Sequence, residues 1–191
     1  LTRRLYAQVE REYEIQKVST SGGTPSLALD ALGFDATLSP DGSKIAFVRG
    51  TCRLEREAYR GPANRDVWVY DISADEYTQL TDFDGNDYSP KWKDNNTLYY
   101  VTPQSGRYNI HELSLDGNSS PITSETEFGI NSFDLSADGT IVYQLADQVK
   151  ILKAGSSVEV ITIDVASDIR FDQTVSKSIN NSLEDFAVSP N

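Results

Sequence analysis

The sequence predicts an all-β fold: a partial β-propeller of about three complete four-stranded blades, with further partial blades. Three observations predict it: a recurring turn motif, a spacing of about fifty residues between its copies, and the lack of any long helical periodicity. The clearest copy is SPDG at residues 39–42. There Pro fixes φ and Gly tolerates positive φ, so the chain reverses between two strands. Ile45 and Phe47 then share one face of the outgoing strand.

Weaker copies of this motif begin at Ser89, Ser136 and Ser189, which gives steps of 50, 47 and 53 residues counted from Ser39. A period of this length with several short strands is typical of a propeller blade. Short strands separated by turns would also suit a β-sandwich. The superperiod favours the propeller, because a sandwich has no reason to repeat a four-strand cassette.

The repeat divides the chain into five segments of one propeller region. They are a partial first blade at 1–33, complete blades at 34–81, 82–123 and 124–168, and the start of a further blade at 169–191. The strands expected in the complete blades are 34–38, 44–49, 66–71 and 77–81, then 88–92, 97–102, 108–115 and 121–123, then 131–135, 140–145, 149–153 and 159–163. Because the last motif copy breaks off at Asn191, we expect the working protein to be longer than this chain.

The N-terminal segment leaves two interpretations open. Residues 13–18 alternate as a strand should, whereas the composition of residues 5–10 suits a short helix. We favour an edge strand of the first partial blade, followed by a turn at 21–25.

Composition excludes several classes of function. The chain has 29 acidic and 17 basic residues and a net charge of −12, so we expect no nucleic-acid surface, which would need clustered Lys and Arg. No apolar run is long enough for a membrane span. Cys52 is the only cysteine, which excludes an internal disulfide or a thiolate metal cluster. Localisation stays open between the cytoplasm and an exported, periplasmic bacterial setting.

Several stretches carry a family resemblance that covers nearly the whole chain. The SPDG unit, DVWVYD at 66–71 and QLT at 79–81 resemble the TolB-type repeat of six-bladed propellers. More narrowly, residues 59–71, 79–87 and 105–110 are similar to the N-terminal propeller of tricorn-type serine peptidases. This resemblance implies a parent protein with a PDZ-like module and a tail-specific-protease-like catalytic core. That core is not in this sequence, and the family's repeat continues into another strand where this chain ends.

The resemblance therefore implies a non-catalytic propeller module of a tricorn-like peptidase, used for assembly and for controlling which peptides reach the core. Its partners would be proteins or peptides, the rest of the parent polypeptide or neighbouring subunits, and no cofactor is expected. The alternative is a stand-alone TolB-like propeller that binds a protein partner. A carbohydrate-active propeller would need paired carboxylates in a central pocket, and the sequence identifies no such pair.

Arginines concentrate in one irregular stretch between two expected strands. Arg53, Arg56, Arg60 and Arg65 form a local basic cluster in an acidic chain. One interpretation is a ligand or partner loop that holds peptide carboxylates by bidentate contacts. The other, which we favour, is surface pairing with Glu55, Glu57 and Asp66, which contributes little.

Other candidate groups have structural interpretations that we favour. His111 lies inside an expected strand and lacks an identifiable nucleophile, and Cys52 lacks a partner base. Residues 82–87 (DFDGND) combine three carboxylates and an amide, as a calcium loop does, but without the distal Glu. The aromatic residues of the strands are expected to pack between blades instead of forming a binding platform. They are Trp68, Tyr70, Trp92, Tyr99, Tyr100 and Tyr108.

Overall fold

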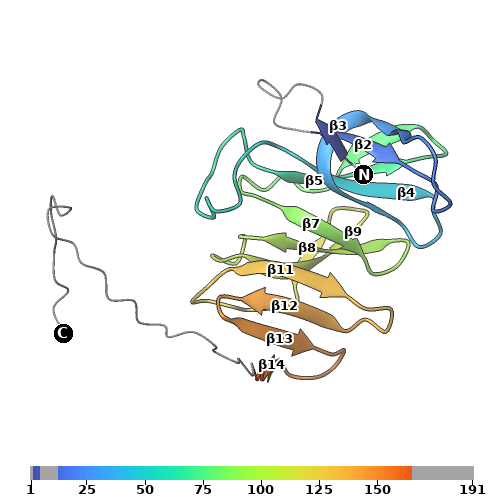
Figure 1. Ribbon diagram of the computed structural model, residues 1–191. Coiled ribbons are helices and arrows are strands. Elements are labelled where there is room, and N and C mark those ends of the chain that lie inside the picture. Colours follow the sequence, from blue (N-terminus) through green and yellow to red (C-terminus); the bar gives the residue numbers. More distant parts are fainter. Residues whose placement is uncertain (1, 5–12, 165–191) are drawn as a thin grey trace, which may run out of the picture. The chain divides into compact units, whose positions relative to one another are not determined.

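The computed structural model describes residues 2–4 and 13–164 (Figure 1). The chain divides into two units, residues 1–161 and 162–191, and only residues 162–164 of the second are described. Within the described residues every regular element is a β-strand, as the sequence predicts. The expected start of a further blade at 169–191 and the alternative helix over 5–10 lie outside the described residues.

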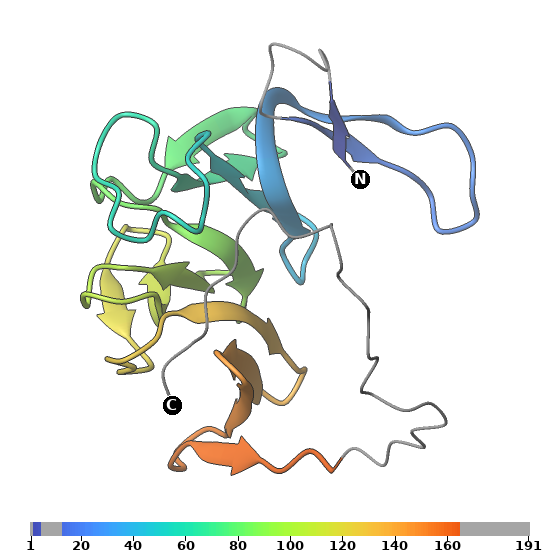
Figure 2. The same cartoon turned by 60° about the vertical axis from the view of Figure 1, so that its left-hand side comes forward.

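The first sheet contains six antiparallel strands in the order β1-β2-β3-β4-β5-β6. They are β1 (Thr2–Arg4), β2 (Tyr13–Lys17), β3 (Ser26–Leu38), β4 (Lys44–Arg49), β5 (Asp66–Asp71) and β6 (Glu76–Gln79). The strand over 13–18 is confirmed as β2. The strand expected at 34–38 is longer, because β3 pairs with β2 through its first half and with β4 through its second (Figure 2).

Gly33 marks the point where β3 changes partner. A Cβ at this position would lie 2.6 Å from the carbonyl oxygen of Val48 and 2.8 Å from the ring of Phe47. Only glycine permits this close approach of two strands. Two residues further on, Asp35 takes a φ of 50° within a register shift of the β3–β4 ladder, as in a β-bulge.

The second and third sheets each contain four consecutive antiparallel strands. The second comprises β7 (Tyr88–Trp92), β8 (Thr97–Thr102), β9 (Asn109–Ser114) and β10 (Ser119–Pro121). The third comprises β11 (Ile130–Leu135), β12 (Ile141–Leu145), β13 (Gln148–Leu152) and β14 (Glu159–Ile161). Strands β4, β5, β7 and β8 coincide with the predicted ranges. Strand β10 covers 119–121 instead of the expected 121–123. Beyond its end, the Thr123 hydroxyl in place of the strand backbone accepts the Ile110 N–H.

The hydrophobic core lies between successive sheets. One cluster joins Ala46, Val67 and Val69 of the first sheet to Leu98 and Tyr100 of the second. Another begins at Val48 and continues through the second sheet into the third. The other face of β4, with Ile45 and Phe47, packs against Ile15 and Leu29 of the first sheet, so β4 buries both of its faces. Each large buried side chain contributes about 1.5–3 kcal/mol of transfer free energy.

The aromatic residues of the second sheet belong to this core. Tyr99, Tyr100 and Tyr108 are buried, and the Trp92 Nε1–H donates to the carbonyl oxygen of Thr37 at 3.1 Å, which ties β7 to β3. Trp68 and Tyr70 of β5 are half-buried. The predicted packing role is confirmed for the four buried aromatics.

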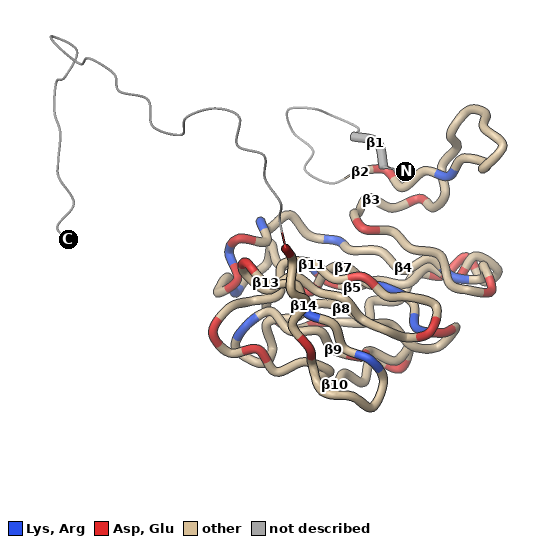
Figure 3. The backbone as a smooth tube through the Cα atoms, turned by 60° about the horizontal axis from the view of Figure 1, so that its bottom comes forward, with Lys and Arg blue, Asp and Glu red and all other residues tan. Residues whose placement is uncertain are grey.

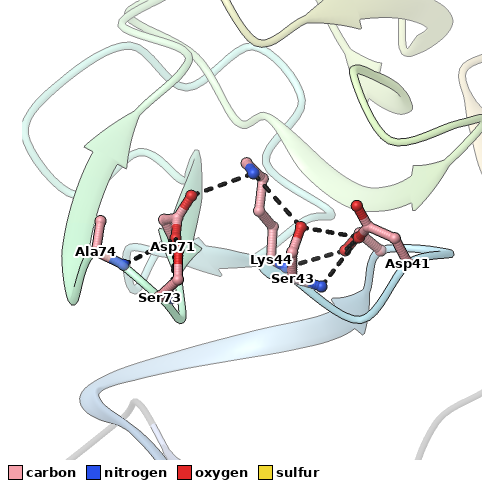
Figure 4. A network of polar contacts seen from close by, with 7 residues as sticks. Asp41, Ser43, Lys44, Asp71, Ser73 and Ala74 are labelled. Carbon is pink, nitrogen blue, oxygen red and sulfur yellow. Dashed lines mark hydrogen bonds and ion pairs between the residues drawn. The ribbon is translucent and has the colours of Figure 1, made fainter.

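The SPDG motif forms a turn held by its own side chains (Figure 4). One Asp41 carboxylate oxygen accepts hydrogen bonds from the Ser43 N–H at 2.9 Å, the Ser43 hydroxyl at 2.8 Å and the Ser39 hydroxyl at 2.7 Å. These donors, the Ser43 N–H first among them, lower the pKa of Asp41 to about 2. The Asp41 N–H donates to the Asn95 side chain at 3.1 Å, so the turn also links the first sheet to the second.

Candidate functional site

A long loop connects β4 to β5 at residues 50–65 (teal in Figure 1), and it contains all four arginines of the predicted basic cluster. We call it the arginine loop. It is fastened to the second sheet, because the Tyr108 hydroxyl donates to the Leu54 carbonyl at 2.9 Å and the Glu57 carboxylate accepts the Tyr108 N–H. A second carboxylate oxygen of Glu57 pairs with Arg107 at 3.2 Å.

Asn86 fixes the base of the arginine loop through hydrogen bonds to Arg65 and Tyr108. Its side chain is fully buried; the oxygen accepts the Arg65 N–H at 3.2 Å and the amide donates to the Tyr108 hydroxyl at 3.2 Å. The same amide lies 3.5 Å from the Cys52 sulfur. The loop is therefore held at its base and at its middle, as a binding loop on a rigid scaffold must be.

The four predicted arginines divide into two groups. Arg56 lies over the Tyr59 ring at 4.6 Å and Arg60 over the Phe83 ring at 5.0 Å. Arg65 is half-buried and donates from Nε to the Cys52 carbonyl at 2.8 Å, while Arg53 is exposed. The favoured ion pairs with Glu55, Glu57 and Asp66 are absent from the described residues, where Glu57 pairs with Arg107 instead.

Arg56 and Arg60 meet Arg107 in a groove of about 710 Å³. It is lined by Glu55, Arg56, Glu57, Ala58, Tyr59, Arg60, Gly106 and Arg107. Aromatic rings cover guanidinium faces and leave guanidinium edges for hydrogen bonds, the geometry in which Arg binds carboxylates. Sequence reasoning missed Arg107, because nothing local indicates that the start of β9 lies against a loop fifty residues earlier.

The groove of the arginine loop has more basic than acidic lining residues, although the chain as a whole is acidic. Acidic positions occur on turns of all three sheets, with basic positions between them (Figure 3). Two of the five groove-lining charges are acidic, but Glu57 is already engaged by Tyr108 and Arg107. Three arginines against two glutamates give the groove lining a net positive charge.

His111 has a structural environment. It is 4% exposed, and its ring nitrogens lie 3.0 Å from the Ser105 hydroxyl and 3.1 Å from the Ser119 hydroxyl. Burial lowers the pKa of His111, so the neutral ring is favoured. No carboxylate of the described residues hydrogen-bonds to it, so the Ser-His-acid arrangement of a hydrolase is not formed around this ring.

Within the described residues, Cys52 and the acidic loop at 82–87 have structural surroundings. Cys52 is buried with an amide, not a base, beside its sulfur. In the part of the chain that the structure describes, no three His, Cys, Asp or Glu side chains are placed to hold a metal ion. Within residues 82–87, Asp82 and Asp84 are exposed, whereas Asp87 is fully buried. The calcium hypothesis therefore gains no support.

The repeated antiparallel sheets define a class of protein: the chain forms part of a β-propeller. The solved structures most informative for this fold include the tricorn protease, with a TM-score of 0.69 and 20% identity over 82% of this chain. TolB from Acinetobacter baumannii has a TM-score of 0.65 and 19% identity over 82% of this chain. A putative TolB from Agrobacterium tumefaciens has a TM-score of 0.61 and 21% identity over 78% of this chain. At these identities the likeness establishes the fold alone, a propeller of the TolB and tricorn type.

The chain spans 15% of the tricorn protease chain, 39% of the Acinetobacter TolB chain and 56% of the Agrobacterium one. No family model and no curated protein matches the sequence. Among the described residues, no helix has the length and apolar character needed to cross a membrane.

Proposed function

We propose that the chain is a non-catalytic propeller module of a tricorn-like serine peptidase, where it serves assembly and controls peptide access to a catalytic core elsewhere in the polypeptide. The observation that carries this proposal is the groove of the arginine loop. It presents Arg56, Arg60 and Arg107 on anchored backbone, and it contains no nucleophile with a positioned base. Its chemistry suits binding a peptide carboxylate, not cleaving a peptide bond.

The test compares binding with hydrolysis. The purified chain is mixed with fluorescent acidic peptides, and both anisotropy and cleavage are recorded. We expect salt-sensitive binding without cleavage, and weaker binding for Arg56→Ala, with Arg53→Ala as the matched control because Arg53 lies outside the groove. Peptide hydrolysis by the isolated chain, lost in His111→Ala, would overturn the proposal.

The alternative is a stand-alone TolB-like interaction propeller, favoured by the two TolB neighbours. Reading the gene beyond Asn191 separates the two functions, because only the peptidase module requires a catalytic core on the same polypeptide. In the full polypeptide, Arg56→Ala should then impair cleavage of long acidic peptides and leave short uncharged substrates unaffected.

A further inference from the structure

Two acidic residues, Asp66 and Asp87, lie at the base of the arginine loop, and the charge of Asp66 acts on Asp87. Asp66 begins β5 directly after the loop, and Asp87 ends the connection that leads to β7. The Asp87 N–H donates to the Arg65 carbonyl at 2.8 Å, which brings the two segments together. Asp87 is fully buried, and neither of its carboxylate oxygens has a hydrogen-bond partner among the described residues. Such a buried, unpartnered group requires an explanation.

In the part of the chain that the structure describes, no Lys or Arg side chain pairs with either carboxyl group. The Thr81 and Thr102 hydroxyls lie near Asp87 and act to lower its pKa, but neither satisfies its carboxylate oxygens, and Asp82 adds a further negative charge. Asp66 accepts a hydrogen bond from the Asn64 amide at 3.2 Å, and Tyr100 of β8 is a further titratable group near Asp87. Among the described residues neither Asp66 nor Asp87 belongs to an ion pair.

Burial is the main cause that raises the pKa of each carboxyl to about 7. The charge of Asp82 raises the pKa of Asp66 further, while the Asn64 amide opposes it. The charges of Asp66 and Asp82 likewise raise the pKa of Asp87, whereas the hydroxyls of Thr102 and Thr81 lower it. The pair therefore changes its protonation close to neutral pH.

The second sheet provides an internal comparison. The Val67 N–H donates to the Thr81 hydroxyl at 2.9 Å, and in the second sheet the Ile110 N–H donates to the Thr123 hydroxyl at 2.9 Å. Asp66 therefore corresponds to Asn109, which precedes Ile110. Likewise, the Asp87 N–H bonds the Arg65 carbonyl as the Ile130 N–H bonds the Tyr108 carbonyl, so Asp87 corresponds to Ile130.

The corresponding position in the second sheet is neutral and fully satisfied. The Asn109 oxygen accepts from the Thr123 hydroxyl at 2.9 Å and the Glu125 N–H at 2.7 Å, and its amide donates to the Glu125 carbonyl at 2.9 Å. Ile130 is fully buried. The blade framework thus forms without either carboxyl group, so the acidic pair is not required by the architecture.

We propose that Asp66 and Asp87 form a proton-binding pair that makes the attachment of the arginine loop depend on pH. With a proton on the pair, one carboxyl can donate a hydrogen bond and the buried charge is reduced. When both groups ionise, two like charges without a cation repel each other at low dielectric. This repulsion weakens the two hydrogen bonds that hold the base of the loop. They run from the Asp87 N–H to the Arg65 carbonyl and from the Arg65 N–H to the Asn86 side-chain oxygen. The inference holds whether or not the loop binds peptides.

Carboxyl carbon NMR on the whole chain tests the proton site directly. We expect the Asp66 and Asp87 resonances to titrate near neutral pH, and the resonance of the exposed Asp84 serves as the internal reference. Hydrogen exchange then tests the attachment. Protection of the Arg65 and Asp87 amides, corrected for intrinsic rate, should fall at least about tenfold between about pH 6 and about pH 9. Titration of both carboxyls near their ordinary pKa, or pH-independent protection, would overturn the proposal.

Two variants separate protonation from folding. Asp87→Asn removes one ionisable group, and the double variant Asp66→Asn/Asp87→Ile copies the second sheet, whose framework is already formed by these residues. Either variant should make amide protection independent of pH, whereas Asp84→Asn should behave as the wild type. Adding calcium alone tests the competing hypothesis that the two carboxyl groups bind a cation. If millimolar calcium restores protection at high pH in the wild type but not in Asp87→Asn, the pair is a cation site and the proton proposal is wrong.

Discussion

Glu57 accepts the backbone N–H of Tyr108 although the two residues are 51 positions apart. The interaction joins the middle of the arginine loop to the start of β9, and Arg107 pairs with the same carboxylate. Gly129 permits it, because a Cβ there would lie 2.6 Å from a Glu57 carboxylate oxygen. One side chain thus connects the first sheet's longest loop to the second sheet.

Replacing Glu57 by Ala should loosen this connection. The Tyr108 N–H and Arg107 would lose their charged acceptor, which typically costs about 1–3 kcal/mol of unfolding free energy. Urea denaturation measures the loss. Glu55→Ala is the matched control, since Glu55 is exposed and contributes to none of the bonds that join Glu57 to Tyr108 and Arg107; its effect should stay within about 0.5 kcal/mol. Equal effects of the two substitutions would show that the interaction does not hold the loop.

Asp87 should make the chain less stable at alkaline pH. Its pKa is raised from 3.8 to about 7 in the folded state, so its contribution to stability is full below 3.8 and is lost as the pH rises through about 7. Asp87→Asn removes this loss and should be more stable than the wild type at about pH 9, by on the order of 2–4 kcal/mol. Thermal denaturation across the pH range measures the difference in stability between Asp87→Asn and the wild type, and this difference should become smaller as the pH falls. A gap that is constant with pH would contradict the expectation.

His111 should make the chain less stable at acidic pH, whereas Asp87 does so at alkaline pH. Burial lowers its folded pKa below 6.5, so its contribution is present above pH 6.5 and is lost as the pH falls, because the unfolded chain takes up a proton that the native chain resists. In His111→Gln the unfolding free energy should fall less steeply between about pH 7 and about pH 5, by up to about 1.4 kcal/mol per pH unit. Ser105→Ala removes one ring partner but keeps the titrating group, so it should retain the wild-type slope.

The fold was largely predictable because its signals are local. Strands β4 and β8 are short, largely buried runs that each follow a turn, and the SPDG motif forms the turn before β4. The first half of β3 was missed because it pairs with β2 and not with β4. The change of partner occurs at Gly33, and a glycine inside a strand resembles a strand end in the sequence.

The site was predictable only in composition. The arginines were visible as a cluster, but which of them point into the groove depends on the Tyr59 and Phe83 rings and on contacts with Tyr108. The pairing of Asp66 with Asp87 likewise depends on backbone bonds between separate segments. In sequence, Asp87 belongs to a calcium-like loop, and only its complete burial reveals a different role.

Arg60 provides the sharpest test of the groove. Its guanidinium lies over Phe83 and donates to the Tyr59 carbonyl at 2.7 Å and the Glu57 carbonyl at 3.1 Å, so the planar group is fixed in orientation. Arg60→Lys keeps the charge but loses the stacking plane and the forked donors. We expect acidic-peptide binding, measured by calorimetry, to weaken at least about tenfold, which corresponds to about 1.4 kcal/mol. Arg53→Lys is the matched control and should bind as the wild type does. If Arg60→Lys binds equally well, the groove attracts anions by charge alone and does not orient them.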